Sequence, residues 1–67
     1  MLITYNQEQK ITLEKEISLK EFLQLQNLQI QGIAVAVDEK IIKKTELESF
    51  ILKDGMAVDV YNMVSGG

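Results

Sequence analysis

Cysteine, histidine, tryptophan and proline are all absent from this chain of 67 residues. Without cysteine, the chain has no disulfide framework, no thiolate nucleophile and no zinc-finger site. Without histidine, it lacks the commonest general base of enzymes and the commonest ligand of transition metals. An enzyme of this size would have to work with carboxylates, lysines and hydroxyls, with little room for a pocket. We therefore expect no catalyst and no metal site, but a protein on which other enzymes act.

Positive charge is also scarce. Seven basic residues face ten acidic ones, so the formal net charge is −3. A nucleic-acid binder needs a basic face, and this balance speaks against one. No apolar run approaches the ~20 residues that span a bilayer, and the first residues lack the charged and apolar parts of a signal peptide. We expect a single globular domain in the cytoplasm, with no nucleic-acid or membrane partner.

The first part of the chain alternates in the manner of two β-strands. Strands are predicted at residues 1–6 and 10–14, and the polar residues between them suit a hairpin turn. Met1, Ile3 and Tyr5 are expected to share one face of the first strand, and Ile11 and Leu13 are expected to point inward from the second.

A helix is predicted to begin at Ser18, where the hydrophobic period changes. Ser18 and Glu21 have the spacing of a capping box, in which a hydroxyl and a carboxylate satisfy backbone N–H groups at the helix start. Apolar residues follow at helical spacing, and the helix should fray near Asn27. A helix of two to three turns is not stable alone, so it must pack on the sheet. Its inward residues are Leu19, Phe22 and Leu23.

The second half of the chain predicts three more strands. The apolar run 33–37 after Gly32 is typical of a buried strand, and 41–42 would be a short return strand. A single helical turn is expected to start at Thr45, which with Glu48 has capping-box spacing. The last strand is predicted at 57–63, after a turn at Gly55. Residues expected to point inward from the helical turn and its exit are Leu47, Phe50 and Leu52.

This order of strands around one main helix indicates an α+β protein with a mixed sheet of four to five strands and the helix across one face. The ubiquitin-like β-grasp has this order, with the first and last strands parallel in the middle of the sheet. We expect a β-grasp domain over 1–63 and a flexible C-terminal tail over 64–67, ending in Gly-Gly.

Several short segments of the chain match one known family in order and spacing. They are Ile3-Thr4-Tyr5-Asn6, Ser18-Leu19, Gly32 to Val37, Leu52-Lys53-Asp54-Gly55 and Gly66-Gly67. Together they resemble the ThiS family, the sulfur carrier proteins of thiamine biosynthesis, along essentially the whole chain. Departures from the family pattern lie in turns: Gln7, Asp38, Lys43-Lys44 and Met56.

The resemblance implies that the chain is activated at its own C-terminus. An E1-like adenylyltransferase would use ATP and Mg to adenylate the Gly67 carboxylate, while the carrier itself binds no cofactor. A sulfur-donor protein, such as a cysteine desulfurase, would then convert the terminus to a thiocarboxylate. Thiazole synthase would take that sulfur.

The residues near the terminus suit this role. Gly66 and Gly67 have no Cβ, so with Val64 and Ser65 they can thread a narrow cleft. Extended, residues 64–67 would reach at most roughly 13–14 Å into a partner. Docking of the body is expected on the sheet face away from the helix, at Tyr61, Met63, Ala34 and Ala36, because aromatic residues and Met are enriched in interface cores. Asp59 and other acids could steer a basic partner.

Alternatives remain open at this point. The chain could be a sulfur carrier of a sister pathway, either the small subunit of molybdopterin synthase or a donor for cysteine or tRNA thiolation. It could be a ubiquitin-like modifier whose Gly67 forms an isopeptide bond. It could also be a binding module whose terminal glycines are inert.

Overall fold

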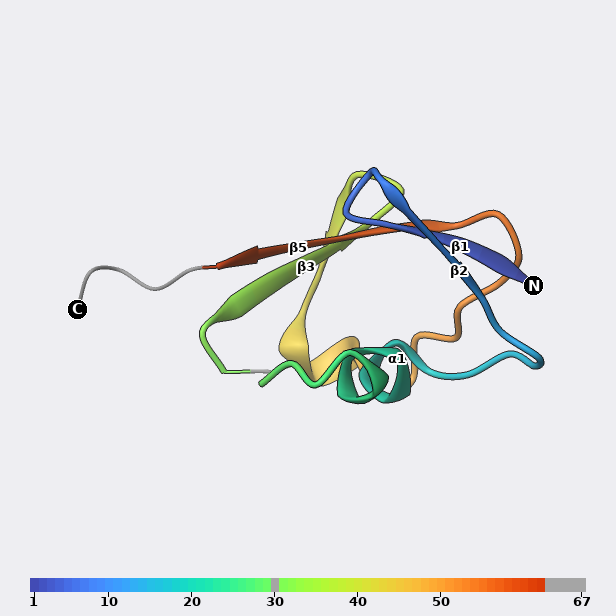
Figure 1. The fold of residues 1–67 in the computed structure, drawn as a ribbon. Helices are drawn as coiled ribbons and strands as arrows, with labels where there is room; N and C mark the ends of the chain where they lie inside the picture. The colour runs from blue at the N-terminus through green and yellow to red at the C-terminus, as the bar shows by residue number, and fades with distance from the viewer. Residues whose placement is uncertain (30, 63–67) are drawn as a thin grey trace.

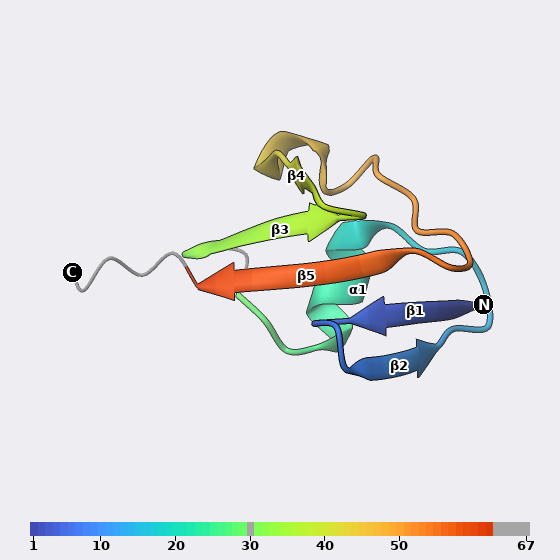
Figure 2. The same ribbon diagram turned by 90° about the horizontal axis from the view of Figure 1, so that it is seen from above.

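The computed structural model describes residues 1–29 and 31–62. A five-stranded sheet, in the order β2-β1-β5-β3-β4, forms one layer, and the helix α1 lies across one face of it (Figures 1 and 2). In chain order the elements are β1 (Leu2–Tyr5), β2 (Gln9–Thr12), α1 (Leu19–Leu25), β3 (Ile33–Val37), β4 (Lys40–Ile42), the 3-10 helix η1 (Lys44–Glu46) and β5 (Ala57–Asn62). This is the predicted β-grasp arrangement.

The first and last strands lie side by side in the middle of the sheet and run parallel, as predicted (Figure 2). Their register is short, with Thr4 opposite Ala57 and Tyr5 opposite Val58. The other neighbour of β5 is β3, which runs antiparallel to it from Ile33–Asn62 to Val37–Val58. The predicted hairpin of β1 and β2 is confirmed, although β2 ends at Thr12, earlier than expected.

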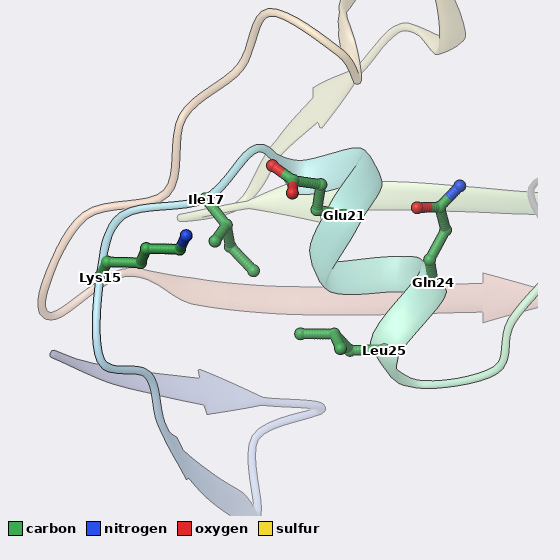
Figure 3. A pocket seen from close by; sticks show the side chains of 5 residues that line it. All are labelled: Lys15, Ile17, Glu21, Gln24 and Leu25. Atoms are coloured by element: carbon green, nitrogen blue, oxygen red, sulfur yellow. The ribbon is translucent and has the colours of Figure 1, made fainter.

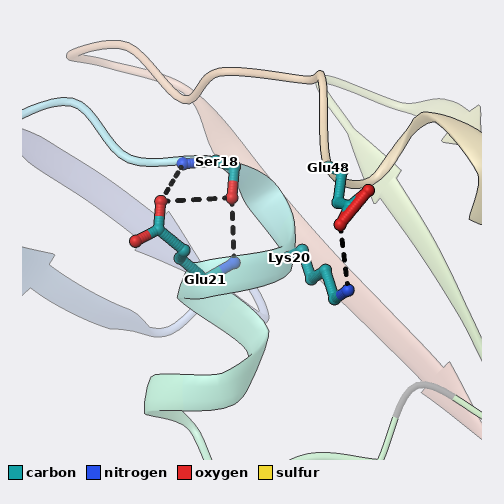
Figure 4. Close-up of polar contacts among 4 residues, drawn as sticks. All are labelled: Ser18, Lys20, Glu21 and Glu48. Atoms are coloured by element: carbon teal, nitrogen blue, oxygen red, sulfur yellow. Dashed lines mark hydrogen bonds and ion pairs between the residues drawn. The ribbon is translucent and has the colours of Figure 1, made fainter.

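The helix begins as the sequence predicts. The Ser18 hydroxyl accepts a hydrogen bond from the Glu21 backbone N–H at 3.1 Å, and a Glu21 carboxylate oxygen accepts one from the Ser18 N–H at 3.2 Å (Figure 4). These two bonds complete the capping box and satisfy two N–H groups that the helix itself leaves unpaired. The helix ends at Leu25, and Asn27 follows with a φ of 60°. The same view shows the ion pair of Lys20 with Glu48, at 3.2 Å.

The core lies between α1 and the covered face of the sheet. The Tyr5 and Phe22 rings meet edge to face, with centroids 5.6 Å apart. Leu47 and Leu52 close the core from the segment before β5, and Phe50 packs against it. The remaining buried core residues are Ile3, Leu19, Leu23, Ile33, Val35, Val37 and Val58. The inward residues predicted from periodicity are therefore confirmed as core or as packed against it.

The predicted start of the second helical turn at Thr45 is wrong. The turn is the 3-10 helix η1, and Lys43 occupies the capping position before it. Glu46 reaches back and accepts a hydrogen bond from the Lys43 backbone N–H at 3.4 Å. A lysine side chain carries no acceptor, so only the carboxylate half of a capping box forms here.

Candidate functional site

Most of the predicted terminal site lies outside the described residues. This applies to Met63, Val64, Ser65, Gly66 and Gly67. Their roles, and the division into a domain and a flexible tail, therefore stay predictions. The structure does describe the strand that leads to them, β5, and the sheet face around its last residues.

The entry to β5 is held by the turn at Asp54 and Gly55. An Asp54 carboxylate oxygen accepts a hydrogen bond from the Leu2 N–H at 2.6 Å, and the Gly55 N–H donates to the Leu2 carbonyl at 2.9 Å. Gly55 has a φ of +88°, a conformation that costs glycine little and other residues more. The predicted turn is thus confirmed, and it ties the start of β5 to the start of β1.

The side chains of Asn6 and Asp38 also bind β5, each at the point where a neighbouring strand ends and its hairpin turn begins. The Asn6 N–H donates to the Val58 carbonyl at 2.8 Å, and the Asn6 side-chain oxygen accepts from the Val60 N–H at 2.9 Å. On the other side of β5, the Asp38 N–H donates to the Ala57 carbonyl at 2.9 Å, and an Asp38 carboxylate oxygen accepts from the Ala57 N–H at 3.0 Å. In each case a side-chain oxygen accepts a β5 backbone N–H in place of a backbone carbonyl from the neighbouring strand.

Asn6 and Asp38 also share a backbone conformation, with φ of 51° and 49°. Asn and Asp tolerate this left-handed region better than other residues with side chains. Sequence reasoning gave Asn6 and Asp38 no role beyond turn formation. The available signal was an Asn or Asp directly after a strand, but that signal does not identify the bonding partner.

The predicted docking residues in the described part of the chain share one face of the sheet. We call this the outer face, the one turned away from α1. Cross-strand pairing places Ala34 opposite Tyr61 and Ala36 opposite Asp59. Tyr61 is 49% exposed and Ala34 is partly exposed, but Ala36 is only 3% exposed. Ala36 therefore offers almost no surface to a partner in this conformation.

Asp59 is likewise covered, with 9% exposure, so it is poorly placed to steer a partner. Two exposed apolar residues that the sequence reasoning did not single out belong to the outer face. Ile41 is 65% exposed and lies opposite Ala36. Leu2 is 44% exposed and lies two residues before Thr4, on the same face of β1; Thr4 pairs with Ala57 on the outer face. The available signal was the pair Ile41-Ile42: neighbouring strand residues point to opposite faces, so one of the two isoleucines had to face outward.

A shallow depression lies elsewhere, between α1 and the segment that precedes it (Figure 3). It has a volume of about 360 Å³ and is lined by Lys15, Ile17, Glu21, Gln24 and Leu25. Ile17 and Leu25 extend into it from opposite sides, and none of its lining residues comes from the outer face of the sheet. Glu21 already serves the capping box, so the depression has no unengaged acid beside its lysine.

Within residues 1–29 and 31–62, no group of three or more acidic, histidine or cysteine side chains is placed to hold a metal ion. No helix in that part of the chain is long and apolar enough to cross a membrane. β5 leads in sequence to Gly67, and the outer face beside it carries exposed apolar side chains.

Comparison with known proteins decides the family. The model of the ThiS family matches residues 2–67. The chain belongs to the ThiS family. A search of the curated proteins found no match. Membership in this family supports a role as a sulfur carrier in thiamine biosynthesis, working with partner enzymes.

Solved structures agree with the fold of this ThiS-family chain. It is similar to the crystal structure of the thiamine biosynthesis protein ThiS from Geobacter metallireducens, with a TM-score of 0.87 and 21% identity over 100% of both chains. It is also similar to an NMR solution structure of a thiamine biosynthesis protein from that organism, with a TM-score of 0.79 and 19% identity over 100% of this chain and 88% of the other. These similarities establish the β-grasp fold.

Proposed function

We propose that this chain carries sulfur for the formation of the thiazole of thiamine, as a thiocarboxylate on Gly67. The observation that carries the proposal is the family match over residues 2–67, which includes the terminal Gly66-Gly67. In this account the chain is a substrate of other enzymes and not itself a catalyst. Its partners are an E1-like adenylyltransferase, a sulfur-donor protein such as a cysteine desulfurase, and thiazole synthase.

Adenylation makes the terminal carboxylate reactive. A carboxylate oxygen of Gly67 attacks the α-phosphorus of ATP, held with Mg by the adenylyltransferase, and pyrophosphate leaves. The product is a mixed anhydride whose leaving group, AMP, is expelled far more readily than an oxide. The carrier needs no cofactor of its own for this step.

Sulfur then replaces the AMP. The terminal sulfur of a donor's persulfide attacks the Gly67 carbonyl carbon and AMP leaves, which forms an acyl disulfide between carrier and donor. A thiol reduces that disulfide, is itself oxidised, and releases the thiocarboxylate. Because the carrier contains no cysteine, none of its own side chains can intercept the acyl group as a thiol or form a mixed disulfide.

The outer face would hold the body of the carrier against its partners while the last residues enter their sites. Tyr61 and Ala34 remain the proposed contacts, together with Met63 beyond the described residues, and the exposed Ile41 and Leu2 extend the same face. Ala36 is covered by its neighbours, so it is not a proposed contact and lies beneath the surface that a partner would meet. Exposed acids, rather than Asp59, would supply any electrostatic steering.

Adenylation is tested by ATP–pyrophosphate exchange with the adenylyltransferase of the same organism. The full chain should support exchange, and a variant without Gly67 should not. Conjugates in which Gly67 is joined to a lysine of another protein would favour a ubiquitin-like modifier. Pyrophosphate exchange without transfer of sulfur to thiazole synthase would favour a carrier of a sister pathway. Lack of exchange with the full chain would contradict the proposal.

A further inference from the structure

The C-terminal half of β5 is paired on one side only. Pairing of β1 with β5 ends at Tyr5 and Val58, whereas β5 continues to Asn62 beside β3. Figure 2 shows β5 running past the end of β1. The cause is local: Asn6 and Gln7 take φ of 51° and 70°, so the chain turns away into β2.

On the β1 side, the last hydrogen bond to β5 in the described part of the chain comes from Asn6. Its side-chain oxygen accepts the Val60 N–H at 2.9 Å, after its own N–H has bound the Val58 carbonyl at 2.8 Å. Within residues 1–29 and 31–62, no hydrogen bond from the β1 side reaches β5 beyond Val60. Without the Asn6 oxygen, β5 would be free on that side from Asp59 onward.

The position of this bond matters because the residues after Val60 lead to Gly67. β3 pairs with β5 as far as Asn62 on one side, and on the other side the Asn6 oxygen makes the last hydrogen bond among the described residues, at the edge of the strand from which residues 61–67 continue to the reacting carboxylate. We infer that Asn6 is a positioning residue: its side-chain oxygen fixes the end of β5 so that the Gly67 carboxylate is presented correctly to the adenylating enzyme. This inference rests on the proposed function.

The chain provides a matched control at the opposite end of the same strand. Asp38 has nearly the same φ, 49°, is also followed by a residue of positive φ, and makes the same type of bond, to the Ala57 N–H at 3.0 Å. Ala57 is the first residue of β5: it lies opposite Thr4 of β1, and Asp38, which follows β3, binds it from the other side. Loss of the Asp38 side chain therefore removes an equivalent bond without releasing the end that leads to Gly67.

The test compares Asn6→Gly with Asp38→Gly, since glycine accepts the positive φ and removes only the side-chain acceptor. Each variant of the full chain is assayed in ATP–pyrophosphate exchange with varied carrier concentration. Thermal unfolding and amide hydrogen exchange are measured alongside. Asn6→Gly should lower kcat/KM by about tenfold to a hundredfold, the scale expected for misplacement of a reacting group. The loss should fall mainly on kcat, because the outer face is unchanged.

Asp38→Gly should lose a similar amount of thermal stability but keep kcat and KM. Hydrogen exchange should accelerate at Val60 in Asn6→Gly and at Ala57 in Asp38→Gly. Asn6→Asp, which keeps an acceptor oxygen at the same place, should restore kcat. This rescue and the split between kcat and KM are results that a merely stabilising role would not produce.

The contrary outcomes are distinct. Equal kinetic losses in the two glycine variants, unchanged kinetics in Asn6→Gly, or failure of Asn6→Gly alone to fold would overturn the positioning role while leaving the proposed function in place. Absence of exchange with the wild-type chain would overturn the proposed function, and the inference with it.

Discussion

The Phe22 ring in α1 and the Tyr5 ring in β1 meet edge to face, at an interplanar angle of 74°. This contact joins the only α-helix of the described residues to a central strand of the sheet. Phe22 is fully buried and Tyr5 is 8% exposed, so the pair forms part of the core. It therefore supports the strand next to β5 and, through it, the part of the sheet that leads to the terminus.

Phe22→Ala should destabilise the fold by about 3–5 kcal/mol, because it removes a fully buried ring and leaves a cavity. For so small a domain this is a large part of the total stability. Urea unfolding followed by circular dichroism measures the loss, and Phe22→Leu should lose clearly less. A loss below about 1 kcal/mol would mean that the helix does not pack on the sheet as described.

Ser18→Ala should cost about 1 kcal/mol, since it removes the hydroxyl that accepts the Glu21 N–H. Glu21→Gln is the matched control, because an amide oxygen can still accept the hydrogen bond from the Ser18 N–H. Thermal unfolding should therefore find Glu21→Gln close to the wild type and Ser18→Ala less stable. Equal stability of Ser18→Ala and the wild type would contradict the cap.

Gly55→Ala should destabilise by about 1–2 kcal/mol through backbone strain alone. An added Cβ would meet no atom within 4 Å, but the φ of +88° is unfavourable for any residue with a side chain. Gly55→Asn should lose less, because Asn visits positive φ more readily. If alanine and asparagine were both neutral in urea unfolding, the turn before β5 would have a different conformation.

Tyr61→Ala should weaken binding to the adenylyltransferase by about tenfold or more, as expected for an exposed aromatic contact at an interface. Its stability should change little, because Tyr61 is 49% exposed. Leu25→Ala is the control: Leu25 is 63% exposed but lies on α1, away from the outer face. Isothermal titration calorimetry should find Leu25→Ala unchanged. The reverse order of effects would move the docking surface to the helix side.

Local patterns predicted most of the fold. The Ser18–Glu21 spacing located the helix start, and the apolar run 33–37 located β3. Such signals succeed because capping and strand alternation depend on residues close together in the sequence. The predicted start of the second turn was wrong because two acids can serve as the carboxylate of a cap there. The spacing of Thr45 and Glu48 suggested one start, but Glu46 accepts a hydrogen bond from the Lys43 N–H, so the turn begins earlier.

Features set by distant residues could not be predicted in this way. The bond from Val60 to Asn6 joins residues at opposite ends of the chain. The burial of Ala36 likewise depends on the strands on either side of β3, not on its own alternation. For the site, the sequence indicated the terminal glycines and the sheet face, but not how β5 is held before them.

The central claim is that sulfur is carried on the main-chain carboxyl of Gly67. The most direct measurement is the intact mass of the carrier after incubation with the adenylyltransferase, ATP, Mg and a persulfide donor with a thiol. Fragmentation then locates any mass change. The account predicts exchange of one oxygen for one sulfur, confined to Gly67 and absent from the chain lacking that residue. An unchanged mass, or sulfur found anywhere else in the chain, would contradict it.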